Sequence, residues 1–308
     1  METPSPPIET PGLRNRPRAV LAVCSNKGGV GKTTVSTNLA IYLRALHEDL
    51  PVLLVGLDDQ SVIERMFRLT PRQPGEGNLK HGWAERCLDG VIQLGQYGIQ
   101  FVPPPPDTAL LKARAEDPHT LRRVLERTDF DGVVILDTKS DLEALTLNAL
   151  TAADHVMLPV SDFASFEEAA KVFELLGRQH LEPVRARVLL TLVDRRTRVD
   201  AHGHDLHDRL VAAIEECGWP LFESFISRSP RVEALNSATG TPGPILHHAR
   251  GTGVHRQLRE LAEEVSKLLD LGPTAAAPMR APAQRVSPGG DSLVEGLKGA
   301  LLRGLRRR

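Results

Sequence analysis

Short apolar runs alternate with longer amphipathic segments through the central part of the chain. The runs are rich in β-branched residues and apolar on both faces, which is typical of parallel strands covered by helices. Each run is therefore predicted to be a buried strand. They are "AVLAVC" (19–24), "VLLVGL" (52–57), "GIQFV" (98–102), "GVVILD" (132–137), "HVMLPV" (155–160) and "ARVLLTLV" (186–193).

Segments of helical length separate these runs. They include 33–46, 118–128, 141–151 and 164–181, and a final helix at about 252–271 is expected to pack on the outside. Such alternation predicts an α/β fold, in which a mostly parallel twisted sheet has helices on both faces and right-handed crossovers. We expect a single domain over residues 19–271.

The two ends of the chain differ from this pattern. Residues 1–18 are proline-rich and are expected to form a disordered N-terminal segment. Residues 272–292 are rich in Pro, Ala and Gly, which predicts a flexible linker. Residues 293–308 combine an apolar stripe at helical spacing with five basic side chains and one acidic side chain. We therefore expect a basic amphipathic tail behind the linker.

Composition narrows the class of protein. The 308 residues carry a net charge of −1, so the whole molecule is not a polycation that must bind nucleic acid. Cys24, Cys87 and Cys217 form neither a CxxC pair nor a zinc spacing, which indicates a reduced, cytoplasmic protein. No apolar run approaches the roughly 18 residues of a membrane-spanning helix, and the N-terminus lacks the apolar core of a signal peptide.

A glycine-rich segment, "GGVGKTT" (28–34), follows the first predicted strand and opens the first predicted helix. Its glycines let the backbone curl so that amide groups point at phosphate oxygens, and the helix N-terminus adds its dipole. This context predicts a P-loop NTPase fold rather than a plain glycine-rich turn. The residues expected to bind the nucleotide are Lys27, Gly28, Gly29, Val30, Gly31, Lys32, Thr33 and Thr34.

The residues of this loop are expected to have different roles. Lys32 is expected to reach the β- and γ-phosphates, the Thr33 hydroxyl to bind Mg²⁺, and Thr34 to lie near the α-phosphate. A magnesium site also needs an acidic residue at the end of a neighbouring strand, and Asp137 closes the run 132–137. Asp137 is therefore the candidate metal ligand, directly or through water, although it could instead cap the following helix.

A second carboxylate follows the second predicted strand. Asp58 comes directly after the run 52–57, which should lie beside the first strand. A carboxylate at this place can orient a water molecule in line with the γ-phosphate. The alternative is a solvated loop aspartate.

Together these segments resemble the ParA/MinD family of deviant Walker A ATPases, and in particular the ParA-like partitioning ATPases. The likeness covers about residues 19–271, and the loop with its first lysine, Lys27, is the most specific part. The segments that carry it are "SNKGGVGKTT" (25–34), "VLLVGLDDQ" (52–60), the stretch 128–160, "LLTLVDRRTR" (189–198) and "FISRSPRVEAL" (225–235).

The resemblance implies a function for the first lysine. In this family it reaches across a nucleotide-sandwich dimer to the partner's phosphates, so Lys27 is expected to be catalytic together with Lys32 and Asp58. A cation delivered in trans stabilises charge on the transferred phosphoryl group, as an arginine finger does. The implied ligands are ATP and Mg²⁺. The implied activity is an ATP-dependent homodimer that hydrolyses ATP slowly until a ParB-like adaptor stimulates it.

Four positions depart from the family pattern. Gly56 replaces the first aspartate of the family's switch segment, and Asp59 stands where proline is usual. After Asp137 the usual Thr-Pro-Pro becomes Thr138-Lys139-Ser140, so Lys139 is expected to loosen this loop or to add charge beside the γ-phosphate. These departures concern the hydrolysis rate more than nucleotide binding, and they favour a second reading, a weakly hydrolysing nucleotide-dependent scaffold.

The sequence contains candidate binding segments for two kinds of surface, DNA and membrane. ParA-like members bind DNA without sequence preference, and the candidate arginines here are Arg195, Arg196, Arg198, Arg228 and Arg231. These arginines could equally be ordinary solvated charge. MinD-like members bind membrane through an amphipathic C-terminal helix, for which residues 293–308 are the candidate; that tail could also bind DNA or a protein, or nothing. We expect a protein that partitions or positions DNA or a large protein cargo, associated with the nucleoid or peripherally with a membrane.

Overall fold

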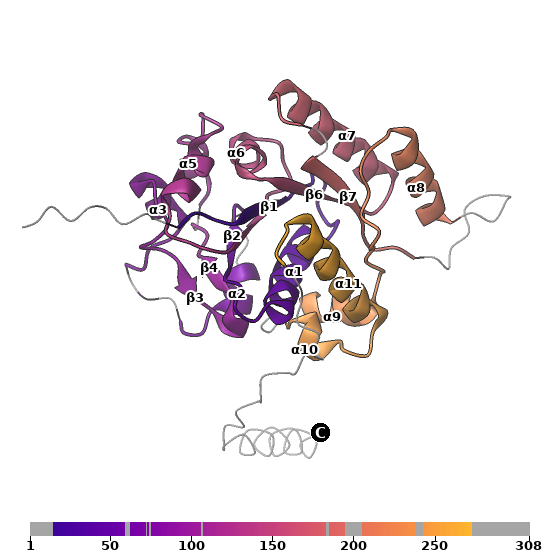
Figure 1. Cartoon of the computed structure of the whole chain (residues 1–308), viewed down its shortest axis with the longest axis horizontal. Helices are drawn as coiled ribbons and strands as arrows, with labels where there is room; N and C mark the ends of the chain where they lie inside the picture. The colour runs from indigo at the N-terminus through magenta and orange to yellow at the C-terminus, as the bar shows by residue number, and fades with distance from the viewer. Residues whose placement is uncertain are drawn as a thin grey trace, which may run out of the picture. The chain divides into compact units, whose positions relative to one another are not determined.

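A seven-stranded sheet forms the centre of the molecule, in the order β3-β4-β2-β5-β1-β6-β7 (Figure 1). Neighbouring strands are parallel except for the edge pair β3–β4. The strands are β1 (Ala19–Val23), β2 (Val52–Gly56), β3 (Gln93–Leu94), β4 (Gln100–Val102), β5 (Val133–Asp137), β6 (His155–Val160) and β7 (Ala186–Leu190). The computed structural model describes residues 15–58, 62–71, 73, 75–105, 107–182, 185–194, 205–237 and 243–272.

Helices cover both faces of the sheet, as expected for strands that are apolar on both sides (Figure 1). Within β1, Val20 and Ala22 belong to the core that faces α5 (Thr120–Arg127), α6 (Ala144–Ala152) and α7 (Phe163–Arg178). On the other face α1 (Lys32–Leu46) packs against α11 (Gly253–Leu268). The remaining helical segments are α2 (Val62–Phe67), α3 (Leu79–Glu85), η1 (Gln96–Gly98), α4 (Ala109–Lys112), α8 (Leu206–Glu216), α9 (Pro230–Ser237) and α10 (Ile245–His248).

The predicted α/β fold with one domain is confirmed for the described residues. All six predicted strands form, although β4 begins at Gln100 because a short 3₁₀ turn occupies the residues before it. The pattern missed β3, since two residues at an exposed edge show no alternation. It also missed the short helices, because a helix of one or two turns shows too little periodicity to be recognised.

The register of the sheet brings three strand ends together. Asp137 at the end of β5 pairs with Val23 of β1 on one side and with Gly56 of β2 on the other. The backbone amide of Leu57 donates to the carbonyl of Asp137 at 2.9 Å. The segments that follow β1, β2 and β5 therefore leave the same edge of the sheet, where ligands bind in open α/β sheets.

Several predicted segments lie outside the described residues. These are most of the N-terminal segment 1–18, nearly all of the linker 272–292 and the whole tail 293–308. Among the described helices none is long and apolar enough to cross a membrane.

Candidate nucleotide site

The loop between β1 and α1 has the backbone of a phosphate cradle. Gly29 and Gly31 adopt left-handed conformations, with φ of 79° and 91°, and other residues are strained there. Gly31 is the N-cap of α1, and no side chain caps this helix end. The first turn of α1 therefore presents amide groups and the positive end of its dipole to the loop, an arrangement that favours an anion.

Lys32 is the first residue of α1 and is only 7% exposed. Its Nζ donates to the Ser140 hydroxyl at 2.6 Å and to the backbone carbonyl of Lys27 at 3.2 Å. Burial lowers the pKa of Lys32, while the nearby Asp137 opposes that change. The cation is thus held at the loop by neutral oxygens and has no direct carboxylate partner among the residues that the structure describes, which suits a group that binds phosphate.

Asp137 lies beneath the start of α1 and is 2% exposed. Burial raises its pKa to about 6, although hydrogen bonds from Thr33 and Ser36 work against the rise. The Ser36 hydroxyl donates to Asp137 Oδ1 at 2.9 Å. A hydroxyl and a carboxylate are oxygen ligands of the kind that Mg²⁺ prefers, so Thr33 and Asp137 fit the metal that the sequence predicts.

Asp58 and Lys139 approach each other across the ends of β2 and β5. Lys139 Nζ lies 4.0 Å from Asp58 Oδ1, and the Asp58 side chain is 16% exposed. The sequence predicted that Lys139 would add charge near the γ-phosphate or loosen its loop. Its position gives a more specific result, because the added cation pairs with the residue expected to orient the attacking water.

The glycine at the end of β2 also has a steric explanation. A Cβ atom at Gly56 would lie 2.9 Å from Cδ1 of Ile63 in α2. The aspartate that the family carries at this position would therefore require Ile63 to move. Glycine at position 56 therefore fits the close packing of α2 against the end of β2.

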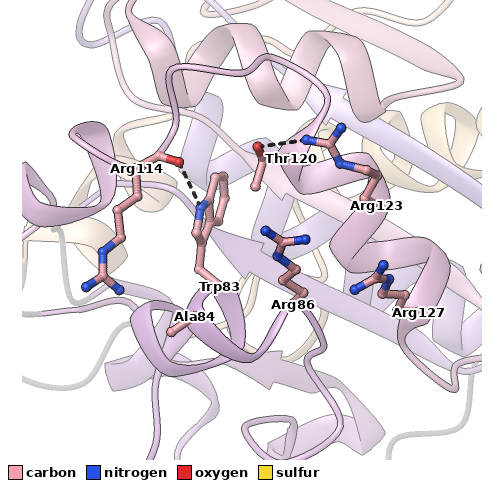
Figure 2. Close-up of a pocket in the computed structure, with 7 residues that line it drawn as sticks. All are labelled: Trp83, Ala84, Arg86, Arg114, Thr120, Arg123 and Arg127. Carbon is pink, nitrogen blue, oxygen red and sulfur yellow. Dashed lines mark hydrogen bonds between the residues drawn. The ribbon is translucent and has the colours of Figure 1, made fainter.

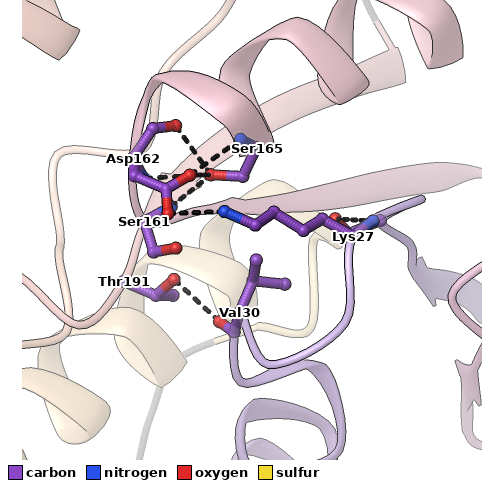
Figure 3. Close-up of polar contacts among 7 residues, drawn as sticks. Lys27, Val30, Ser161, Asp162, Ser165 and Thr191 are labelled. Carbon is purple, nitrogen blue, oxygen red and sulfur yellow. Dashed lines mark hydrogen bonds and ion pairs between the residues drawn. The ribbon is translucent and has the colours of Figure 1, made fainter.

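Lys27 binds a carboxylate of its own subunit (Figure 3). Its Nζ lies 2.6 Å from Asp162 Oδ2, and the two side chains are 33% and 41% exposed. The other carboxylate oxygen of Asp162 accepts from the Ser165 amide at 2.8 Å and caps α7. Partial burial alone would raise the pKa of Asp162, but the bonds from Lys27 and Ser165 hold it below its usual value.

Sequence reasoning missed three residues that hold the loop: Ser140, Asp162 and Thr191. The Thr191 hydroxyl donates to the Val30 carbonyl at 2.8 Å, which ties the end of β7 to the loop (Figure 3). Asp162 carried a weak signal, because an aspartate just before an amphipathic helical segment is a common helix N-cap. Nothing local in the sequence indicates that its carboxylate meets Lys27, 135 residues away.

The structure brings together the loop residues, Asp58 and Asp137, and of the predicted DNA-binding arginines it describes Arg228 and Arg231. Arg228 is exposed and its Nε donates to Glu233 Oε1 at 2.8 Å. Arg231 is exposed in α9. Arg195, Arg196 and Arg198 lie outside the described residues.

Comparison with known proteins identifies the family of this chain. A family model described as "AAA domain" matches residues 18–176. The chromosome-partitioning ATPase Soj of Thermus thermophilus is 33% identical over 273 residues, which cover 82% of this chain and 97% of that protein. The chain belongs to the ParA/MinD family of ATPases. The chromosome partitioning protein ParA of Caulobacter vibrioides is similar at 28% identity, over 84% of this chain and 98% of its own.

A solved member of the family has the same fold. The septum site-determining protein MinD of Pyrococcus horikoshii, in complex with Mg-ADP, superposes with a TM-score of 0.62. The match covers 82% of this chain and 98% of that one, at 21% sequence identity. At this identity the likeness shows the fold alone.

Proposed function

We propose that this chain is an ATP-dependent dimerising ATPase switch that partitions or positions DNA or a large protein cargo. Members of the ParA/MinD family are ATPases, and two relatives are named for chromosome partitioning. One observation carries the proposal: Lys32 and Asp137 lie close together where the paired strands β1 and β5 end, while Lys27, on the same loop as Lys32, is one-third exposed and paired with Asp162.

We infer that residues 28–34 hold the triphosphate. The loop amides and the N-terminus of α1 would bind the phosphates, Lys32 would bind the β- and γ-phosphates, and Thr34 would lie near the α-phosphate. Thr33 and Asp137 would hold Mg²⁺, which would neutralise phosphate charge. The MinD relative of known structure contains Mg-ADP, which supports both ligands for this chain.

Lys27 gives the switch its dependence on ATP. Its cation is bonded to Asp162 within one subunit, and we infer that it exchanges this carboxylate for the γ-phosphate of nucleotide in a second subunit. Only the triphosphate offers that charge, so hydrolysis would return Lys27 to Asp162 and release the dimer. Asp58 would orient the attacking water.

The hydrolysis rate is proposed to be slow without a partner. The ion pair between Lys139 and Asp58 places a competing cation at the residue that must orient water. A ParB-like adaptor would stimulate the reaction. The same pair supports the second candidate, a nucleotide-dependent scaffold with little turnover. An ATPase rate that is abolished by Asp58→Ala would eliminate the scaffold.

DNA is the proposed surface for the ATP-bound dimer, through Arg228 and Arg231 together with the arginines of the segment 195–198. Because phosphate contacts add, a dimer would double this basic surface. A MinD-like membrane regulator that uses residues 293–308 is the alternative. The protein would then act at the nucleoid in the first case and at a membrane surface in the second.

Sizing of the full chain by light scattering, with ATP, with ADP and without nucleotide, tests the proposal. We expect a dimer only with ATP. Adding duplex DNA and anionic liposomes in turn identifies the surface, and deletion of 293–308 should abolish liposome binding only if the MinD-like alternative is right. An ATP-bound protein that stays monomeric, or that binds neither surface, would contradict the proposed switch.

A further inference from the structure

The segment that follows β5 meets the phosphate loop at Ser140. The Ser140 hydroxyl accepts a hydrogen bond from Lys32 Nζ at 2.6 Å. A Cβ atom at Gly28 would lie 3.9 Å from the same oxygen. Ser140 is exposed, so a ligand that binds at the loop can reach its polar atoms. These atoms therefore lie beside the ammonium group that is expected to bind phosphate.

Serine at position 140 adds two hydrogen-bond donors, where the family pattern has a proline. Proline has no backbone N–H and no polar side-chain atom, whereas serine has an amide and a hydroxyl. Among the residues that the structure describes, the Ser140 amide donates to no acceptor. The Ser140 hydroxyl contacts only the Lys32 ammonium there, and an ammonium cannot accept a hydrogen bond. Both donors of Ser140 are thus left for a ligand.

Hydrogen bonds on both sides of Ser140 hold its segment in place without the prolines. The Thr138 amide and hydroxyl both donate to the Val23 carbonyl, at 3.3 and 3.1 Å. On the other side, Asp141 Oδ1 accepts from the Thr146 hydroxyl at 3.1 Å. A donor that is already held in position loses little conformational entropy when it binds a ligand. Ser140 is therefore positioned before any ligand binds.

We propose that Ser140 binds the γ-phosphate and makes the site prefer ATP to ADP within a single subunit. This inference rests on the proposed function, in which Lys32 reaches the β- and γ-phosphates. Because Lys32 and Ser140 are in direct contact, a phosphate group bound by one lies within reach of the other. N–H and O–H groups form strong hydrogen bonds to a charged phosphate oxygen. ADP lacks the terminal phosphate and would leave the donors of Ser140 unused.

This role differs from those of the two nearby lysines that the fold directs elsewhere. Lys27 would reach the nucleotide of a second subunit, so it can select ATP only in the dimer. Lys139 precedes Ser140, but its Nζ lies 4.0 Å from Asp58 Oδ1 and is directed at the carboxylate that would orient water. Ser140 would thus select the triphosphate before assembly, and the monomer that dimerises would already hold ATP.

Calorimetric titration of the full chain with Mg-ADP and with the magnesium complex of a non-hydrolysable ATP analogue tests this role. Ser140→Ala should weaken binding of the analogue by about tenfold, because one hydrogen bond to a charged group is lost. The ADP dissociation constant should change by less than about twofold. Ser140→Pro removes both donors and should weaken analogue binding at least as much. Ser140→Thr keeps both donors and should restore the preference for the analogue.

Two further variants control the measurement. Ser224→Ala removes a serine hydroxyl outside the nucleotide site, since Ser224 contacts Glu264 through its backbone amide, and it should leave both dissociation constants unchanged. In a Lys27→Ala background, the contact from a second subunit is removed. Ser140→Ala should still weaken analogue binding there, because the proposed contact lies within one subunit.

The outcomes separate a phosphate contact from a structural role. Equal weakening of analogue and ADP by Ser140→Ala would mean that Ser140 only positions Lys32, and would overturn the inference. Unchanged analogue binding in both Ser140→Ala and Ser140→Pro would also overturn it, as would an effect that disappears in the Lys27→Ala background.

Lys32→Ala distinguishes failure of this inference from failure of the proposed nucleotide site. If Lys32→Ala weakens binding of both nucleotides while the Ser140 variants bind like the wild type, the nucleotide site stands and the role of Ser140 is wrong. If Lys32→Ala leaves the binding of both nucleotides unchanged, the proposed site and the role of Ser140 are both wrong.

Discussion

The two lysines of the loop are held in different ways. Lys32 is buried at the start of α1 among neutral oxygens, and its position follows from the fold of the loop itself. Lys27 is one-third exposed, and a carboxylate from a distant helix holds it. The first arrangement is buried, and we propose that it binds phosphate. The second can be exchanged, because an ion pair at the surface contributes only about 0.2–1 kcal/mol.

Lys32→Ala should have the largest effect on this comparison. Removing a buried cation that makes charged hydrogen bonds to phosphate should weaken ATP binding by about 100-fold or more. Titration calorimetry with Mg-ATP measures the change, and a circular dichroism melt verifies that the variant is folded. A dissociation constant within about fivefold of wild type would show that Lys32 is not the main phosphate ligand.

Lys27→Ala should separate binding from assembly. We expect ATP affinity to change by less than about threefold, whereas the ATP-dependent dimer and the stimulated release of phosphate should be lost, with a rate loss of roughly 10³-fold as for a missing arginine finger. Light scattering and a phosphate-release assay report the two properties. Lys171→Ala, which removes another exposed lysine paired with Glu168, is the matched control. An unchanged dimer in Lys27→Ala would refute the role in trans.

Asp162→Asn should release Lys27 and preserve the helix cap. An asparagine oxygen can still accept from the Ser165 amide, so α7 should remain capped while the ion pair is lost. The ATP-dependent dimer should then form at up to about fivefold lower protein concentration. Asp205→Asn is the control, because Asp205 caps α8 in the same way through Asp208. A weaker dimer in Asp162→Asn would mean that Asp162 supports assembly.

Lys139→Gln should have the smallest effect. The pair with Asp58 is loose, at 4.0 Å, so removing the charge should raise the basal ATPase rate by up to about fivefold without changing ATP affinity. Lys112→Gln, at a lysine that pairs with Asp141 and Glu143 nearby, serves as the control. A slower reaction in Lys139→Gln would show instead that this cation assists the phosphoryl transfer.

The local parts of the site were predictable. The glycines at 29 and 31, the lysine at 32 and the strand that ends in Asp137 are all fixed within a few residues of chain. Strands and helices were also predictable where an element was long enough to repeat its hydrophobic period. Short elements such as β3 and α2 were missed for lack of that length.

The partners of these residues could not be predicted in the same way. That Lys139 faces Asp58, that Ile63 fills the space beside Gly56, and that Lys27 meets Asp162 all depend on how separate strands end at one edge of the sheet. The hollow beside Trp83 is likewise assembled from α3, α5 and the loop between α4 and α5 (Figure 2). No local pattern joins residues that lie in different elements.

By itself the sequence determined the α/β architecture, the phosphate loop and the family. Hydrophobic periodicity and the residue types of the loop are local features that short stretches of chain contain in full. Only the tertiary structure decided what each charge of the site faces. The reason is electrostatic: the state of a lysine or a carboxylate depends on burial and on charges within a few ångströms, and those neighbours come from distant parts of the chain.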